Sequence, residues 1–97
     1  QLYYAKTDQT WVAIKENKVV FILTKKPNLR TSLGDISVGE PKEAAFRLPD
    51  DYLEKKPRQT LKLKSSDAHV YHGMMIFTGR ATKKIPAKVT SIAVFSE

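Results

Sequence analysis

The chain has 97 residues, of which 17 are lysine or arginine and 10 are aspartate or glutamate, for a formal net charge of +7. This length predicts one domain with one hydrophobic core over residues 1–97. The chain contains no cysteine, which excludes a disulfide framework, a zinc–thiolate site and a thiolate nucleophile. The longest apolar run, residues 19–23, is far shorter than the ~20 residues of a membrane span, so no transmembrane segment is expected.

Short runs of β-branched and aromatic residues, separated by turn residues, predict an all-β chain. Residues 2–6 predict a first strand. The runs 10–15 and 18–24 flank the polar pair Glu16-Asn17 and predict a β-hairpin. The apolar run within the second hairpin strand predicts a central strand with both faces covered, or a strand that gives one face to a partner.

The rest of the chain continues the strand pattern. Alternation over 58–65 predicts a half-buried strand with Leu61 and Leu63 inward and a basic outer face. The apolar run 69–78 predicts one strand long enough to cross a whole sheet, and Gly73 inside it indicates a bulge or a close approach of another backbone. The remaining expected elements are a loop with one edge strand over 29–40, a strand over 43–48, a turn at 49–52 capped by Asp50, and a strand over 89–95.

This pattern favours an antiparallel immunoglobulin-like sandwich of about seven or eight short strands, with a small barrel as the alternative. The segment from Leu61 to Phe77 resembles the end of an immunoglobulin-like or fibronectin-type domain, in which a leucine strand, a turn and a tyrosine lead into the central strand. The resemblance implies that Tyr71 is a tyrosine corner whose hydroxyl bonds to the backbone near residues 65–67. It also implies that Trp11 is a core aromatic of the opposite sheet.

No residue pattern predicts catalysis, a metal or a cofactor. His69 and His72 are three residues apart, so on one regular strand they would point to opposite faces and could not share a metal unless a bulge at Gly73 turned one of them. Asp50, Asp51 and Glu54 match no calcium loop. Nucleophile motifs and phosphate-binding glycine loops are also absent from the sequence, and a non-enzymatic protein is expected.

The basic excess predicts an acidic protein partner or nucleic acid, set against the simpler reading that it serves solubility. A nucleic-acid surface would form if the basic residues shared one contiguous face, whereas basic residues dispersed over the protein would favour a role in solubility. The residues concerned are Lys55, Lys56, Arg58, Lys62, Lys64, Lys83, Lys84 and Lys88.

The favoured function is a non-catalytic protein-binding module, for which exposed aromatic residues join part of the basic stretch as partner-binding candidates. These candidates are Tyr3, Tyr4, Tyr52, Lys55, Lys56, Arg58, Lys62 and Lys64. A small basic β-barrel that binds nucleic acid and an accessory domain of a larger protein are the alternatives.

Residues 17–21 (Asn-Lys-Val-Val-Phe) and the Leu48-Pro49-Asp50 turn resemble parts of small periplasmic immunity-type lipoproteins linked to type VI secretion. That resemblance implies steric occlusion of a toxin or enzyme, and a place in the periplasm or on an outer-membrane lipid anchor upstream of Gln1; the cytoplasm stays an alternative. The start at Gln1 leaves open a fragment or a mature form that has lost a targeting segment.

Overall fold

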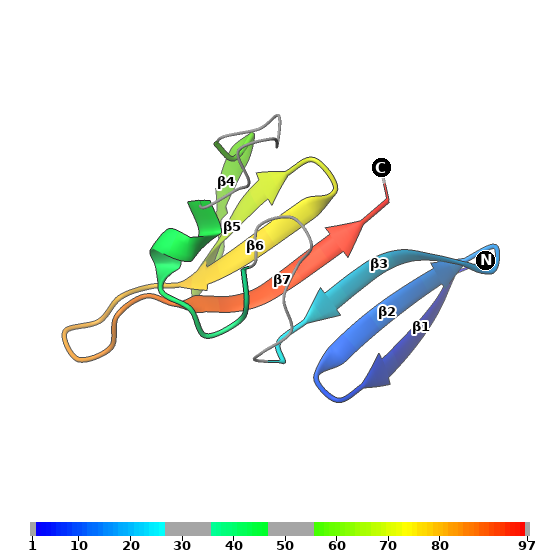
Figure 1. The fold of residues 1–97 in the computed structure, drawn as a ribbon, viewed down its shortest axis with the longest axis horizontal. Helices are drawn as coiled ribbons and strands as arrows, with labels where there is room; N and C mark the ends of the chain where they lie inside the picture. The colour runs from blue at the N-terminus through cyan, green and yellow to red at the C-terminus, as the bar shows by residue number, and fades with distance from the viewer. Residues whose placement is uncertain (1, 27–35, 47–55, 97) are drawn as a thin grey trace.

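Seven strands form one continuous sheet, and a short 3-10 helix packs on it (Figure 1). The computed structural model describes residues 2–26, 36–46 and 56–96. In chain order the elements are β1 (Leu2–Thr7), β2 (Thr10–Lys15), β3 (Lys18–Thr24), η1 (Lys42–Phe46), β4 (Gln59–Lys62), β5 (Ser66–Tyr71), β6 (Met74–Gly79) and β7 (Val89–Phe95).

The sheet consists of two meanders that meet at its centre. The strand order is β1-β2-β3-β7-β6-β5-β4, so β1 to β3 form one meander and β4 to β7 the other, joined where β3 pairs with β7. Every neighbouring pair is antiparallel, which confirms the all-β antiparallel class. A sandwich is not confirmed, because the described strands pair into one sheet and a sandwich needs two.

The hairpin predicted around Glu16-Asn17 is confirmed. Its two turn residues have φ of 53° and 63°, the positive values that a type I′ turn requires, and β2 pairs with β3 across them. The β1–β2 turn uses the same geometry at Asp8 and Gln9, with φ of 42° and 62°. Both turns match the right-handed twist of the strands that they join.

The single long strand predicted over 69–78 is wrong, because the chain reverses in its middle. β5 ends at Tyr71, a turn follows at His72-Gly73, and β6 begins at Met74. Gly73 has φ of 70°, and a Cβ there would lie 3.3 Å from the carbonyl oxygen of Phe95. The close approach of another backbone, one of the two alternatives read from this glycine, is therefore confirmed.

The strand predicted over 43–48 is also wrong, because residues 42–46 form η1 and residues 47 and 48 lie outside the described part. Ala44 and Ala45 are adjacent, yet both are buried, at 1% and 0% exposure. Adjacent side chains of a strand point to opposite faces, whereas a helical turn can bury two neighbours against one surface. The small alanines let η1 lie close against β6 and β7.

Strand β4 is an edge strand whose side chains are all exposed. The inward orientation predicted for Leu61 and Leu63 is not found, since they are 38% and 43% exposed. β3 is an interior strand of the sheet, yet Val19 and Ile22 are 54% and 40% exposed, so the chain itself does not cover both faces of β3. The alternative that one face is given to a partner stays a prediction. Alternation predicts that two faces differ, but not whether another layer covers either of them.

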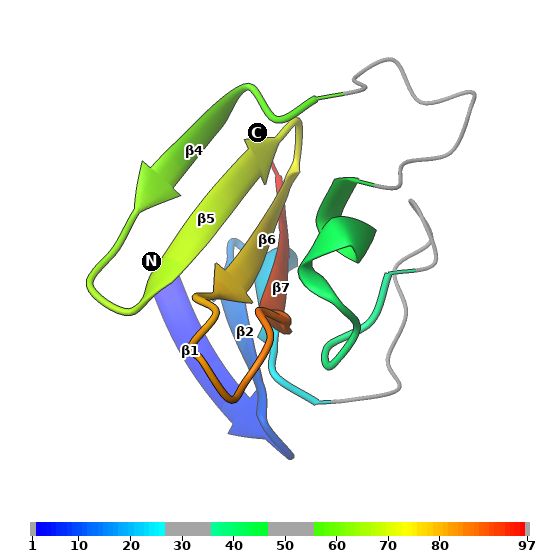
Figure 2. The ribbon, with the colours of Figure 1, turned by 90° about the vertical axis from the view of Figure 1, so that its left-hand side faces the viewer.

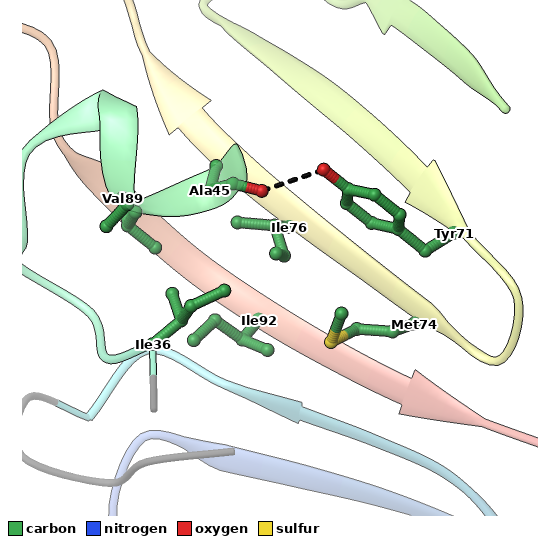
Figure 3. Close-up of a cluster of buried hydrophobic side chains, with 8 residues drawn as sticks. Ile36, Ala45, Tyr71, Met74, Ile76, Val89 and Ile92 are labelled. Carbon is green, nitrogen blue, oxygen red and sulfur yellow. Dashed lines mark hydrogen bonds between the residues drawn. The ribbon is translucent and has the colours of Figure 1, made fainter. Parts of the chain in front are cut away.

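The core lies between η1 and the sheet (Figure 3). The hydroxyl of Tyr71 donates a hydrogen bond to the carbonyl oxygen of Ala45 at 2.8 Å, so the tyrosine ties β5 to η1 rather than to residues 65–67. The predicted tyrosine corner is therefore wrong, because the partner lies 26 positions earlier in the chain. The buried cluster comprises Ile36, Ala44, Ala45, Tyr71, Met74, Ile76, Val89 and Ile92.

Candidate functional site

The sheet has one face covered by η1 and one that we call the open face. Ile76 and Ile92 pair across β6 and β7 and lie in the core under η1. Because side chains alternate along a strand, Phe77 and Ala93 belong to the opposite, open face. Leu23 pairs with Ala93, and Trp11 pairs with Leu23, which places both residues on the open face too. Trp11 therefore belongs to the same sheet as the core strands, and its predicted place in an opposite sheet is wrong.

The open face is hollowed by the curvature of the sheet. Figure 2 shows η1 on one side and the edge strands β1 and β4 curling toward the other. Four strand spacings separate β3 from β4, which would put them about 19 Å apart in a flat sheet. Leu23 from β3 and Leu63 after β4 nevertheless line the same hollow, of about 420 Å³. Its other lining residues are Lys25, Ser65, Ser66, Phe77, Thr90 and Ser91.

Two lysines lie beside Trp11, and one of them, Lys25, lines the hollow. The ammonium of Lys6 is 5.1 Å and that of Lys25 is 5.8 Å from the centroid of the indole ring. Both distances are within the ~6 Å at which a cation is attracted by an aromatic face. Lys25 belongs both to this cluster and to the lining of the hollow, so positive charge stands at the rim of an apolar depression.

Most of the described basic residues collect at one end of the sheet, which we call the positive end. Because neighbours are antiparallel, β1, β3, β4 and β6 finish where β5 and β7 begin. In Figure 1 the arrows of β1, β3 and β6 all point to this end, at the lower left. Its basic residues lie on these strand ends and the loops between them: Lys6, Lys25, Lys26, Lys62, Lys64, Arg80, Lys83, Lys84 and Lys88.

The carboxylates near the positive end do not cancel this charge. Asp8 forms an ion pair with Lys26 at 2.5 Å, and Asp67 forms one with Arg80 at 3.1 Å. On the η1 face, the carboxylate of Glu40 accepts a hydrogen bond from the backbone N–H of Ser37 at 2.9 Å. Glu43, exposed in η1, also lies near the β6–β7 loop. The seven basic residues of this end that are in neither ion pair outnumber Glu40 and Glu43.

Arg80 shapes this end rather than pointing freely into solvent. Its guanidinium donates to the carbonyl oxygens of Leu63 at 2.6 Å and Lys64 at 3.2 Å, besides its ion pair with Asp67. Charge-assisted hydrogen bonds of this kind hold backbone in a fixed position. Arg80 therefore fixes the β4–β5 turn, which carries Leu63 to the hollow and Lys64 to the positive end.

The structure separates the basic residues that the sequence grouped. Lys62, Lys64, Lys83, Lys84 and Lys88 lie at the positive end. Lys56 and Arg58 lie at the other end of β4, where the guanidinium of Arg58 donates to Nδ1 of His72 at 3.1 Å. The predicted set is thus neither one contiguous face nor fully dispersed.

The predicted aromatic contacts are only partly described. Tyr3 and Tyr4 are in edge strand β1, where they pair with Ile14 and Ala13 of β2. Tyr52 and Lys55 lie outside the described residues, as do the acidic residues 50, 51 and 54.

Sequence reasoning missed Lys6, Lys25, Lys26 and Arg80 as members of the charged site. The pair Lys25-Lys26 was visible directly after a predicted strand. Its proximity to the loops at 63–66 and 80–88 depends on the pairing of β3 with β7, however, and no local pattern indicates that pairing.

His69 is held inside the sheet by two threonines. Its Nδ1 shares a hydrogen bond with the hydroxyl of Thr60 at 3.3 Å and its Nε2 one with that of Thr78 at 2.9 Å. The ring of Phe46 covers it edge-on, with the centroids 5.0 Å apart. Both ring nitrogens share hydrogen bonds with threonine hydroxyls, so this histidine joins β4, β6 and η1 and is poorly placed to act as a base on a substrate.

Burial lowers the pKa of His69 from its ordinary value of 6.5; the charge of Asp67 opposes the shift and that of Lys42 adds to it. The folded protein thus binds this proton less readily than the unfolded chain. We expect the free energy of unfolding to keep its full value above pH 6.5 and to fall as the pH drops through the lowered pKa of His69 in the folded state. Urea unfolding at pH 7.5 and at acidic pH measures the effect. A His69→Gln variant is expected to lose this part of the pH dependence, and a variant with an unchanged profile would contradict the assignment.

The described part of the chain contains no group of three or more side chains that could hold a metal ion. Nor does any described helix have the length and apolarity to cross a membrane.

A scan against protein-family models, a search of curated proteins and a search of solved structures find no match for this chain.

Proposed function

We propose that this protein is a non-catalytic binding module that takes an acidic protein partner at the positive end of its sheet. The observation that carries the proposal is the gathering of lysines from both meanders at this one end, where nearby Asp8 and Asp67 are already in ion pairs. A field of one sign over a protein surface steers oppositely charged partners and selects against like-charged ones.

Nucleic acid is the second candidate, and the position of Trp11 beside Lys6 and Lys25 favours it. An indole ring among lysines can stack on a base while the lysines contact phosphates. β-Sheet surfaces that bind nucleic acid in this way stack about two or three bases on aromatic rings. Trp11 is half-buried and offers a single ring for stacking, fewer than such surfaces use, so we favour the acidic protein partner.

In an immunity-type role, the same binding would act by steric occlusion. The module would cover the active site of a toxin or another enzyme with its positive end and need no chemistry of its own. A place in the bacterial cell envelope belongs to this proposal and stays a prediction.

A charge-reversal pair tests the proposed function. The first variant combines Lys64→Glu, Lys83→Glu and Lys84→Glu at the positive end. The control combines Lys15→Glu, Lys18→Glu and Lys56→Glu, which are exposed lysines away from that end and give the same change in net charge. Binding to poly-L-glutamate and to single- and double-stranded DNA is measured by fluorescence anisotropy at low salt and in about 0.5 M salt, where the Debye length is only a few ångströms.

We expect the positive-end variant to bind poly-L-glutamate about tenfold more weakly, since three reversed surface contacts at ~0.2–1 kcal/mol each reach that factor. The control variant is expected to bind nearly as well as the unmodified protein. Equal weakening of both variants would overturn the proposal, because only net charge would then matter. DNA binding that is tighter than poly-L-glutamate binding, and quenches Trp11, would replace the proposal with the nucleic-acid function.

A further inference from the structure

The hollow on the open face adjoins the positive end but has a different chemical character. Its lining brings together an aliphatic side chain from each meander, Leu23 and Leu63, with the ring of Phe77 between them in strand order. Its volume of about 420 Å³ falls within the range of roughly 300–1,000 Å³ that is typical of ligand pockets. The hollow is therefore large enough for an apolar side chain of another molecule.

The charge around the hollow specifies what should accompany that side chain. Lys25 is in the lining and Lys64 directly follows Leu63, whereas the lining residues that the structure describes include no carboxylate. Ser65, Ser66 and Ser91 add hydroxyls that can donate hydrogen bonds. An apolar group flanked by carboxylates complements this arrangement in both polarity and charge.

We infer that the hollow receives an apolar side chain of the acidic protein partner, with a neighbouring carboxylate of the partner beside Lys25. This inference rests on the proposed function and adds an anchor to it. Charge at the positive end attracts the acidic partner, and the apolar contact in the hollow selects among acidic segments those that have a suitable side chain. Binding interfaces generally combine a desolvated apolar anchor with a charged rim in this way.

Two peptides that differ in one residue test the anchor. One has leucine and the other alanine at its centre, and both have two glutamates on each side, so their charges are equal. Affinities are measured by NMR titration and by the fluorescence of Trp11, the only tryptophan of the chain. We expect the leucine peptide to bind about tenfold more tightly, the factor that corresponds to ~1.4 kcal/mol from partial burial of the larger side chain.

Two exposed leucines of the same segment supply the variant and its matched control. Leu63 lines the hollow and is 43% exposed, whereas Leu61 is 38% exposed and lies outside the lining. The Leu63→Gln variant is expected to bind both peptides equally, and the Leu61→Gln variant to keep the preference for leucine. Because both side chains are partly exposed and lie outside the buried core cluster, neither substitution should unfold the protein.

The outcomes separate the inference from the function on which it rests. Equal binding of the two peptides to the unmodified protein, still lost on charge reversal at the positive end, would overturn the anchor and leave the proposed function standing. Loss of the leucine preference in Leu61→Gln would also overturn the place of the anchor. Binding of neither peptide would overturn both proposals.

Discussion

Replacing Tyr71 with alanine is expected to lower the free energy of unfolding by about 3–5 kcal/mol, the usual cost of removing a large aromatic side chain from a core. Tyr71 is fully buried, and its hydroxyl donates to the carbonyl oxygen of Ala45. The substitution leaves a cavity and removes a contact that ties η1 to the sheet. Since ~1 kcal/mol shifts the Tm of a domain of this size by about 4–8 °C, a drop of more than about 10 °C should be seen by circular dichroism.

The Tyr71→Phe variant isolates the hydroxyl from the ring. It keeps the ring packed against Met74 and Ile76 of the same cluster but leaves the buried carbonyl of Ala45 without this donor. Such a loss costs about 1–3 kcal/mol. A Phe variant as stable as the unmodified protein would show that the hydrogen bond contributes nothing to holding η1.

The Ile76→Ala variant is expected to lose about 2–5 kcal/mol in urea unfolding, the range for removing a buried aliphatic side chain and leaving a cavity. Ile76 is fully buried in β6 and pairs with Ile92 of β7 and His69 of β5. These strands form the part of the sheet on which η1 packs. The cavity would therefore open in the middle of the core.

Ile85 provides the matched control, because it is 62% exposed in the β6–β7 loop. The same change at this position, Ile85→Ala, should alter the free energy of unfolding by less than ~0.5 kcal/mol. Similar losses at both positions would place the stabilising core somewhere other than under η1.

Local sequence signals predicted the elements that depend on neighbouring residues alone. The pair Glu16-Asn17 between two apolar runs predicted a hairpin, and its type I′ turn is present. The last strand was predicted over 89–95, and β7 has these same bounds. In both cases a turn residue and the apolar pattern beside it lie within a few positions of each other.

The same signals failed where a local pattern has two solutions. The apolar run 69–78 fits one long strand as well as two strands around His72-Gly73, and contact with the backbone of Phe95 decides for the turn. The segment 43–48 fits a strand by composition, but burial of both Ala44 and Ala45 against the core requires a helical turn. Each choice depends on a contact with a segment far away in the chain.

The candidate site shows the same division. Lysine doublets such as Lys25-Lys26 and Lys83-Lys84 can be read from the sequence, and so can the overall basic excess. Their gathering at one end depends on the pairing of β3 with β7, and the hollow depends on the curvature that brings Leu23 and Leu63 together. Neither property has a local cause.

The sequence by itself determined an all-β antiparallel chain, the hairpin turn at Glu16-Asn17, and a surplus of positive charge, because strand alternation, turn conformation and charge are properties of adjacent residues. Only the tertiary structure decided that the described strands form one curved sheet with η1 on one face and a hollow on the other. The physical reason is that strand order and curvature arise from hydrogen bonds and packing between segments many positions apart, where the sequence carries no periodic signal.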